Sequence, residues 1–435
     1  MTKKEFLTEI KEIMLLDDIS ESTDIEVDSL ASLMLIAFLD ENFSISINQE
    51  QIKLICSKVN SAIEKKQNLN SINFEDCDHL KNEIIQIVNR NRSYLGQMDV
   101  NARSKLVWDF YEETLSKLKN YGCHILRLDA FAYLHKEAGE SNFFNQPGTW
   151  QYLERINQIA QKNKLILLPE IHAEYGLGLH HEVAQKGYSI YDFFLPGLMI
   201  YSIENKTNKA ILTWAKEIIS KGYKTVNMLG CHDGIPVLDL KGKEVNGIFK
   251  KGLLNDTDID DLMNTIIKRG GRVKNLYDPS GHKISYYQVN ATFFSALGED
   301  ERKLLFARAV QMFMPGIPQV WYLDLFAGKN DYKAADKAGD SGHKEINRTA
   351  LDMQDVAHCL QKDIVLNQLE IIRLRNTSKA FLGTVNFNEV SDHDINIEWV
   401  NQNDTAQLCA NLKTLEFSIN HFQKGATKAI NFHYN

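Results

Sequence analysis

From Gln97 onward the chain alternates between short apolar runs and longer amphipathic stretches. Strand-length runs include HILRLD, LILLPE, YDFF, TVNMLGC and PQVWYL, and helical spacing is found in stretches such as TWQYLERINQIAQKNK, NKAILTWAKEIISKG and RKLLFARAVQMFM. This alternation is typical of parallel strands joined by crossover helices. From residue 379 on, the runs FLGTVNFNEV, INIEWV, AQLCANL and LEFSINHF are short and alternating, which predicts an antiparallel β-domain.

Three carboxylates stand at or just after the ends of separate apolar runs. They are Asp129 in HILRLDAF, Glu170 in LILLPEIHA and Asp233 in VNMLGCHDGIPVLD. The carboxyl ends of parallel barrel strands face one mouth, so we expect these three acids to converge. Two carboxylates facing one bond suffice for glycoside cleavage, one as nucleophile and one as proton donor. The chain is therefore interpreted as a carbohydrate-active enzyme.

The neighbours of these acids suit the same chemistry. Arg127 is two residues before Asp129 and shares its strand face, so its guanidinium keeps that carboxylate ionised, as a nucleophile must be. Burial at the end of a Leu and Ile strand should raise the pKa of Glu170 and retain the proton of a general acid. His232 and Asp233 form a pair suited to gripping adjacent sugar hydroxyls. Any one acid could instead be an ordinary strand-end carboxylate, but the three together favour a site.

Length, net charge, cysteine content and the lengths of apolar runs limit the classes of protein that fit this chain. A length of 435 residues predicts two or three domains, and a formal net charge of −8 argues against nucleic acid as the main partner. The six cysteines form no C-x-x-C pair, and no apolar run is long enough to span a bilayer. The N-terminus lacks the continuous apolar stretch of a signal peptide. We expect a cytoplasmic protein.

The adjacent His180 and His181 are interpreted as part of a solvated loop rather than as ligands. No metal site is predicted.

The first 68 residues differ from the rest and are predicted to form a separate helical domain. An acidic loop leads into EVDSLASLMLIAFLDENFSISI, in which Asp-Ser-Leu opens an apolar helix. This stretch resembles an acyl carrier protein, and the resemblance implies 4′-phosphopantetheine on Ser29, where a helix N-terminus would favour the phosphodiester. The alternative is that Ser29 is merely an N-terminal helix residue. Residues 69–96 are predicted to be a linker with a connecting helix, residues 97–378 a catalytic barrel domain, and residues 379–435 the β-domain.

The segments around the three acids resemble the α-amylase superfamily of glycoside hydrolases, and more closely its sucrose phosphorylase-like branch. The matching motifs are RLDAFAYLHKEAG, LLPEIHAEYG, LGCHDGIPVLDLKG and MPGIPQVWYLDLFAGKND…INR, in order across about residues 97–378. The resemblance implies Asp129 as covalent nucleophile, Glu170 as general acid/base and Asp233 as transition-state stabiliser. It places Arg127, His232 and Arg348 around the glucosyl group, and His172 and Tyr175 on the acceptor side.

The implied reaction is a retaining double displacement in which phosphate takes the glucosyl group from sucrose or a related glucoside. It needs no metal or organic cofactor. The chain departs from the family in showing only about five of eight barrel strands, the fourth to the eighth. The expected fold is thus an incomplete (β/α)8 TIM barrel with a C-terminal antiparallel β-domain and an N-terminal helical bundle. Three accounts stay open: a complementary barrel fragment, an artificial junction, or an inactive barrel. An α-glucoside hydrolase, a sugar-binding remnant and a carrier protein with acyl-carrier partner enzymes are the alternative functions.

Overall fold

The computed structural model describes residues 100–137, 140, 143–277, 283–339, 343–423 and 426–430. The carrier-like region at 1–68, its Ser29 and the linker at 69–96 lie outside the described residues. The chain divides into two compact units. The first comprises residues 1–114 and 132–158, and the second comprises residues 115–131 and 159–435.

In the first unit an aromatic cluster lies around Trp108. The Trp108 indole N–H donates to the Ala102 carbonyl at 2.8 Å, and its ring centroid is 5.6 Å from that of Tyr152. The Arg155 guanidinium lies 3.9 Å from the Trp108 ring centroid, within cation–π range. Helices α5 (Lys105–Asn120) and α6 (Gly148–Lys162) supply these side chains.

The second unit contains five parallel strands in chain order. Strand β1 (Ile125–Leu128) pairs with β2 (Ile166–Pro169), and β4 (Thr225–Asn227) lies between β3 (Ile190–Asp192) and β9 (Ile317–Pro318). Strand β2 also lies against β3. Side chains from β2, β3 and β4 meet in one apolar cluster that includes Leu168, Tyr191 and Val226. The predicted parallel α/β arrangement is confirmed. Among the described residues, β1 and β9 each pair with one strand only.

Helices and hairpins fill the connections between these strands and after them. Between β3 and β4 lie α8 (Leu195–Asn205) and α9 (Lys209–Lys221), and α7 (Leu179–Gln185) precedes β3. Between β4 and β9 the chain forms η4 (Leu238–Leu240), the hairpin β5 (Lys243–Val245) and β6 (Ile248–Lys250), α10 (Asp256–Lys268), the hairpin β7 (Arg272–Tyr277) and β8 (Lys283–Asn290), α11 (Phe293–Ala296) and α12 (Glu301–Phe313). After β9 come α13 (Tyr322–Leu325), α14 (Tyr332–Ala338), η6 (His343–Asn347), α15 (Met353–Cys359), α16 (Asp363–Thr377) and η7 (Lys379–Leu382).

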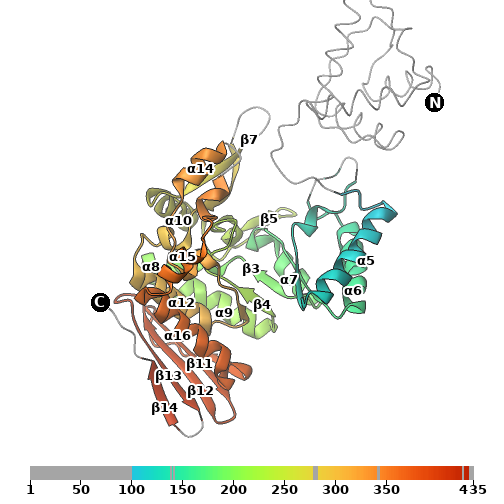
Figure 1. Ribbon diagram of the computed structural model, residues 1–435. Helices are drawn as coiled ribbons and strands as arrows, with labels where there is room; N and C mark the ends of the chain where they lie inside the picture. The colour runs from blue at the N-terminus through green and yellow to red at the C-terminus, as the bar shows by residue number, and fades with distance from the viewer. Residues whose placement is uncertain are drawn as a thin grey trace, which may run out of the picture. The chain divides into compact units, whose positions relative to one another are not determined.

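The chain ends in the predicted antiparallel sheet. Its strands β10 (Thr384–Phe387), β11 (Asp394–Asn401), β12 (Asp404–Asn411), β13 (Glu416–Gln423) and β14 (Ala426–Ile430) pair in sequence order. Alternate residues of β11 are buried, and this face contacts α12, which packs on α16 (Figure 1). The Trp399 indole N–H donates to the Phe313 carbonyl at the end of α12, at 2.7 Å. An apolar face with period two therefore anchors the sheet to the helical layer.

Two local expectations were wrong. In PQVWYL only the beginning is strand, because β9 ends at Pro318 and Tyr322–Leu325 is helical. A short apolar run of this kind does not distinguish strand from buried helix by periodicity alone. His180 and His181 lie on helix α7 rather than in a solvated loop, and both rings contact Tyr223.

Within the described part of the chain, Cys123, Cys231, Cys359 and Cys409 are free thiols. None of the helices described is both long enough and apolar enough to cross a membrane.

Candidate active site

One guanidinium joins the first two predicted acids. Arg127 Nη1 lies 2.8 Å from Asp129 Oδ1, and Nη2 of the same group lies 2.6 Å from Glu170 Oε1. Strands β1 and β2 pair in parallel with Leu128 opposite Pro169, so the residues that follow them leave the sheet side by side. The predicted convergence of Asp129 and Glu170 is therefore present. A retaining glycosidase needs its two carboxyl groups about 5–5.5 Å apart, which suits a pair that one guanidinium bridges.

A sharp turn after Asp129 fixes this geometry. Ala130 has a φ of 48°, in the left-handed region that non-glycine residues seldom adopt. Its N–H donates to Glu170 Oε2 at 3.2 Å, and the Glu170 N–H donates to the Leu128 carbonyl at 3.0 Å. The strained turn thus serves to hold the Glu170 carboxyl against the end of β1.

Asp129 and Glu170 differ strongly in exposure. The side chain of Asp129 is 45% exposed, whereas that of Glu170 is 7% exposed. Burial raises the pKa of the Glu170 carboxyl, although the charges of Arg127 and His172 and the hydrogen bond from Ala130 oppose the shift. The sequence-based expectation of a raised pKa at Glu170 is confirmed. A buried acid beside an open carboxylate is the division of roles that glycosyl transfer needs.

Asp233 follows β4 at a tight turn. Gly234 has a φ of 107°, and a Cβ there would lie 2.7 Å from the Val289 carbonyl oxygen, so this turn requires glycine. Asp233 Oδ1 lies 2.7 Å from Lys344 Nζ and 3.2 Å from Arg348 Nη2. Burial acts to raise the pKa of Asp233, but the hydrogen bond and charge of Lys344, with the charges of His232 and Arg348, hold it below its usual value.

His232 and Arg348 both lie beside Asp233. His232 Nε2 is 3.4 Å from Asp233 Oδ2, and Arg348 Nε donates to the His232 carbonyl at 2.9 Å. The pKa of His232 is lowered by burial and by the charges of Arg127, Arg348 and Lys344, against the opposing charge of Asp233.

His172 lies between two carboxylates. Its Nδ1 is 3.2 Å from Asp239 Oδ1, and its Nε2 is 3.6 Å from Glu170 Oε1. Its ring stacks on Phe193 with centroids 3.6 Å apart. His172 therefore lies beside Glu170, and its place on the acceptor side stays a prediction.

The Tyr175 hydroxyl bonds to Glu217 rather than to one of the three predicted acids. Its hydroxyl donates to the Glu217 carboxylate on α9, which also accepts from Tyr223 at 3.1 Å and lies 3.4 Å from His180 Nε2. The hydroxyl of Tyr175 therefore belongs to a polar network with α7 and α9. Of the predicted barrel site residues, Arg127 and His172 lie against Asp129 or Glu170. His232 and Arg348 lie against Asp233. The Tyr175 hydroxyl points to Glu217 instead.

Sequence reasoning missed two residues of the site. Lys344 stands four residues before Arg348 in KEINR, and Asp239 stands six residues after Asp233 in DGIPVLD. The signal for Asp239 was an acid that closes the apolar PVL run, just as Asp129 and Glu170 close theirs. Lys344 carries no such signal, since only the tertiary fold brings η6 to Asp233.

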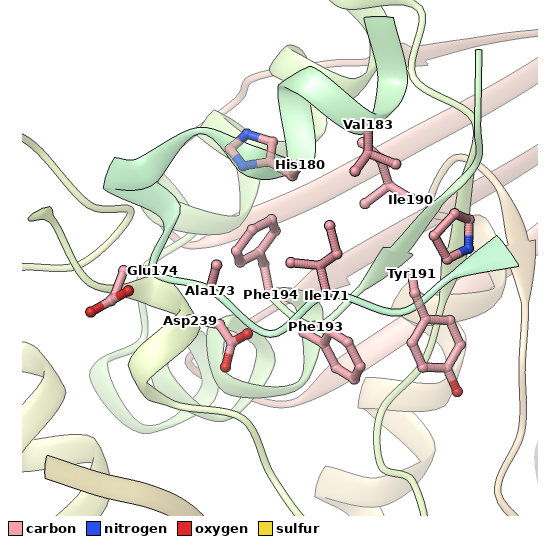
Figure 2. Close-up of a pocket in the computed structure, with 11 residues that line it drawn as sticks. Ile171, Ala173, Glu174, His180, Val183, Ile190, Tyr191, Phe193, Phe194 and Asp239 are labelled. Carbon is pink, nitrogen blue, oxygen red and sulfur yellow. The ribbon is translucent and has the colours of Figure 1, made fainter. Parts of the chain in front are cut away.

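A small cavity lies beside the site. Asp239, Phe193 and Tyr191 line it together with Ile171, Ala173 and His180 (Figure 2). Its volume of about 20 Å³ is close to that of one water molecule, so it is too small for a sugar. In the described part of the chain, no group of three or more His, Cys, Asp or Glu side chains is placed to hold a metal ion.

Several known proteins are similar to this chain in sequence or in fold. A sucrose 6(F)-phosphate phosphorylase from Ilumatobacter coccineus is 54% identical over 348 residues, which cover 80% of this chain and 66% of that protein. One from Thermoanaerobacterium thermosaccharolyticum is 32% identical over 332 residues, covering 75% of this chain and 64% of that protein. The crystal structure of sucrose 6F-phosphate phosphorylase from Thermoanaerobacter thermosaccharolyticum superposes with a TM-score of 0.67 at 30% identity, covering 76% of this chain and 65% of that one.

The chain is related to the sucrose phosphorylase-like proteins of the α-amylase superfamily. No protein-family model matches it. The chain spans slightly less than two thirds of the length of these relatives.

Proposed function

We propose that this chain transfers an α-glucosyl group from sucrose, or a closely related glucoside, to inorganic phosphate with retention of configuration. The observation that carries the proposal is the Arg127 guanidinium bridging the exposed Asp129 and the buried Glu170. Asp129 attacks the anomeric carbon while Glu170 gives its proton to the departing glycosidic oxygen. A β-glucosyl ester on Asp129 results. A phosphate hydroxyl oxygen then attacks the anomeric carbon of that ester and gives its proton to Glu170. The bond between the anomeric carbon and Asp129 breaks, and α-glucose 1-phosphate leaves.

The remaining site residues hold the sugar. Asp233 stabilises the positive charge that develops on the ring in the transition state, while His232 and Arg348 bind the glucosyl hydroxyls. Lys344 and Arg348 both contact Asp233 Oδ1, so they keep this carboxylate ionised and oriented. His172 faces the acceptor side. The same role at Tyr175 stays a prediction, because its hydroxyl is engaged by Glu217.

The charges of the site favour phosphate over water as acceptor. When phosphate arrives, Asp129 is esterified and uncharged, so the carboxylates that repel the dianion are Glu170 and Asp233. Three cations, Arg127, Lys344 and Arg348, lie in contact with those same carboxylates and offset the repulsion. The names of the relatives support this assignment, since they are phosphorylases of sucrose 6(F)-phosphate, sucrose, glucosylglycerol and glucosylglycerate. Among these donors we favour sucrose 6F-phosphate, for which the 54% identical relative is named.

Product analysis tests the proposal. The protein is incubated with sucrose 6F-phosphate or sucrose, with and without phosphate, and glucose 1-phosphate and free glucose are measured. Phosphate-dependent glucose 1-phosphate is the expected product. Free glucose released without phosphate would instead establish an α-glucoside hydrolase. Donor binding by calorimetry with no product of either kind would establish a sugar-binding protein without turnover.

A partner polypeptide is a further part of the proposal. In the described residues β1 and β9 each lack a second strand neighbour, and the chain spans slightly less than two thirds of its relatives. We propose that a complementary fragment supplies strands to these edges, because unpaired parallel edges are costly to expose. Co-expression of this chain with the remaining third of the Ilumatobacter relative should give a co-purifying complex with higher activity. Failure of the two to associate would count against it.

A carrier function at Ser29 is a separate proposal. It is supported only by the Asp-Ser-Leu triplet and the apolar stretch after it, which lie outside the described residues. Intact mass after incubation with coenzyme A and a phosphopantetheinyl transferase tests it. A mass increase that Ser29→Ala abolishes would support it, and an unshifted mass would refute it.

A further inference from the structure

Asp239 is a buried carboxylate that the proposed reaction does not use. It lies on η4 with 7% of its surface exposed, and its Oδ1 is 3.2 Å from His172 Nδ1. It also lines the small cavity next to Phe193 (Figure 2). A carboxylate buried this deeply is costly unless a partner compensates it, and His172 is that partner.

Two contacts fix the imidazole ring of His172, one to its face and one to its Nδ1 atom. Phe193 stacks on one face at a centroid distance of 3.6 Å, and Asp239 accepts from Nδ1. The opposite nitrogen, Nε2, lies 3.6 Å from Glu170 Oε1 and has no hydrogen-bond partner in the described part of the chain. A buried nitrogen held beside the general acid without a closer partner is placed for an electrostatic role.

We propose that Asp239 and His172 form a positioning pair for Glu170, in which Asp239 orients the imidazole and holds it protonated so that Nε2–H faces the carboxyl of the general acid. This inference rests on the proposed function, since it assigns Glu170 the acid/base role. It adds two parts that the proposed reaction does not contain: Asp239 as a positioning residue and a fixed charge state for His172.

The electrostatics agree with the geometry. Burial acts to lower the pKa of His172, but the charge and hydrogen bond of Asp239, together with the charges of Glu170 and Asp233, raise it above the usual value. A protonated His172 in turn lowers the pKa of Glu170, as Arg127 does, while burial and the charge of Asp129 raise it. An acid/base group must give and take a proton in successive steps, so a pKa near the working pH serves it best. The pair opposes the effect of burial and therefore limits how far the pKa of Glu170 rises.

Two variants test the pair. In Asp239→Asn the carboxylate charge is lost, so the pKa of His172 should fall. In His172→Gln the imidazole itself is lost. Both remove positive charge beside Glu170, so the protonated acid persists to higher pH. The alkaline limb of kcat/KM for the glucosyl donor should move up by roughly half to one pH unit in each. Glu174→Gln is the matched control. It removes a carboxylate that lies two residues after His172 and pairs with Lys243. It should change neither the pKa of His172 nor the alkaline limb of kcat/KM.

The measurements keep this inference separate from the proposed function. Imidazole titration by nitrogen-15 NMR, with the His172 signal identified by its absence in His172→Gln, reports the pair without any turnover. The expected result is a pKa of His172 that falls in Asp239→Asn and is unchanged in Glu174→Gln. An unchanged titration of His172 in a folded Asp239→Asn protein would overturn the inference, as would rate loss in His172→Gln with an unmoved pH profile. Absence of wild-type phosphorolysis would refute the proposed function alone.

Discussion

Arg127 and Glu170 form an ion pair of 2.6 Å in which the carboxylate is almost fully buried and the guanidinium is 26% exposed. The other nitrogen of the same guanidinium contacts the exposed Asp129. One cation therefore serves two carboxylates in different surroundings. This arrangement couples the proton on Glu170 to the charge of its neighbour, because the charge of Arg127 lowers the pKa that burial raises.

Removal of that cation should shift the pH dependence. In Arg127→Met the lowering effect on Glu170 is lost, so the pKa of the acid rises further and the alkaline limb of kcat/KM moves to higher pH. The rate should also fall by roughly 10²-fold or more, since both carboxylates lose their orientation. Arg127→Lys keeps the charge but not the two-pronged contact, so its rate should fall while the limb moves less. Equal shifts in both variants would contradict this account.

Lys344 should matter more for phosphate than for the glucosyl donor. In Lys344→Met one of the two cations on Asp233 is lost, and with it attraction for the incoming dianion. The KM for phosphate should rise roughly three- to tenfold, a modest change because the side chain is partly exposed. Initial rates at varied phosphate and varied donor separate the two KM values. Lys333→Met, on the exposed surface of α14, is the control. A larger effect on the donor KM would exclude a phosphate-binding role.

Trp399 should carry much of the attachment of the C-terminal sheet. It is 7% exposed, and its indole N–H bonds to the Phe313 carbonyl. Trp399→Phe loses this hydrogen bond and should cost about 1–2 kcal/mol of unfolding free energy. Trp399→Ala also opens a cavity and should cost about 3–5 kcal/mol. Urea unfolding followed by circular dichroism measures both. Equal stability of the two variants would mean that the sheet is held chiefly by other contacts.

The sequence predicted the acids well because their signal is local. Asp129 and Glu170 each end an apolar run, and the ends of parallel neighbours are necessarily adjacent. Arg127 could be predicted beside Asp129 because residues two apart on a strand share one face. By contrast, the direction of Tyr175 depends on Glu217, which lies 42 residues away on α9. Lys344 depends on η6 reaching a turn 111 residues earlier. Contacts of that separation are set by tertiary packing, which no short pattern records.

The helix at Tyr322–Leu325 is a second case in which a short sequence pattern did not predict the structure. An aromatic and apolar run has strand composition, yet Leu323 and Asp324 are buried within a helical turn. Asp324 lies close to Gly230, where a Cβ would come within 2.8 Å of its carboxylate. Gly230 thus leaves room for the Asp324 carboxylate, a contact between segments that no short pattern records.

Trapping of the glucosyl-enzyme tests the central claim most directly. Glu170→Gln is incubated with α-glucosyl fluoride, whose leaving group needs no proton, in the absence of phosphate, and digested peptides are analysed by mass spectrometry. The account predicts one added glucosyl unit on the Asp129 carboxylate, and its disappearance as glucose 1-phosphate when phosphate is supplied. A glucosyl unit on another residue, or turnover that persists in Asp129→Asn, would contradict it.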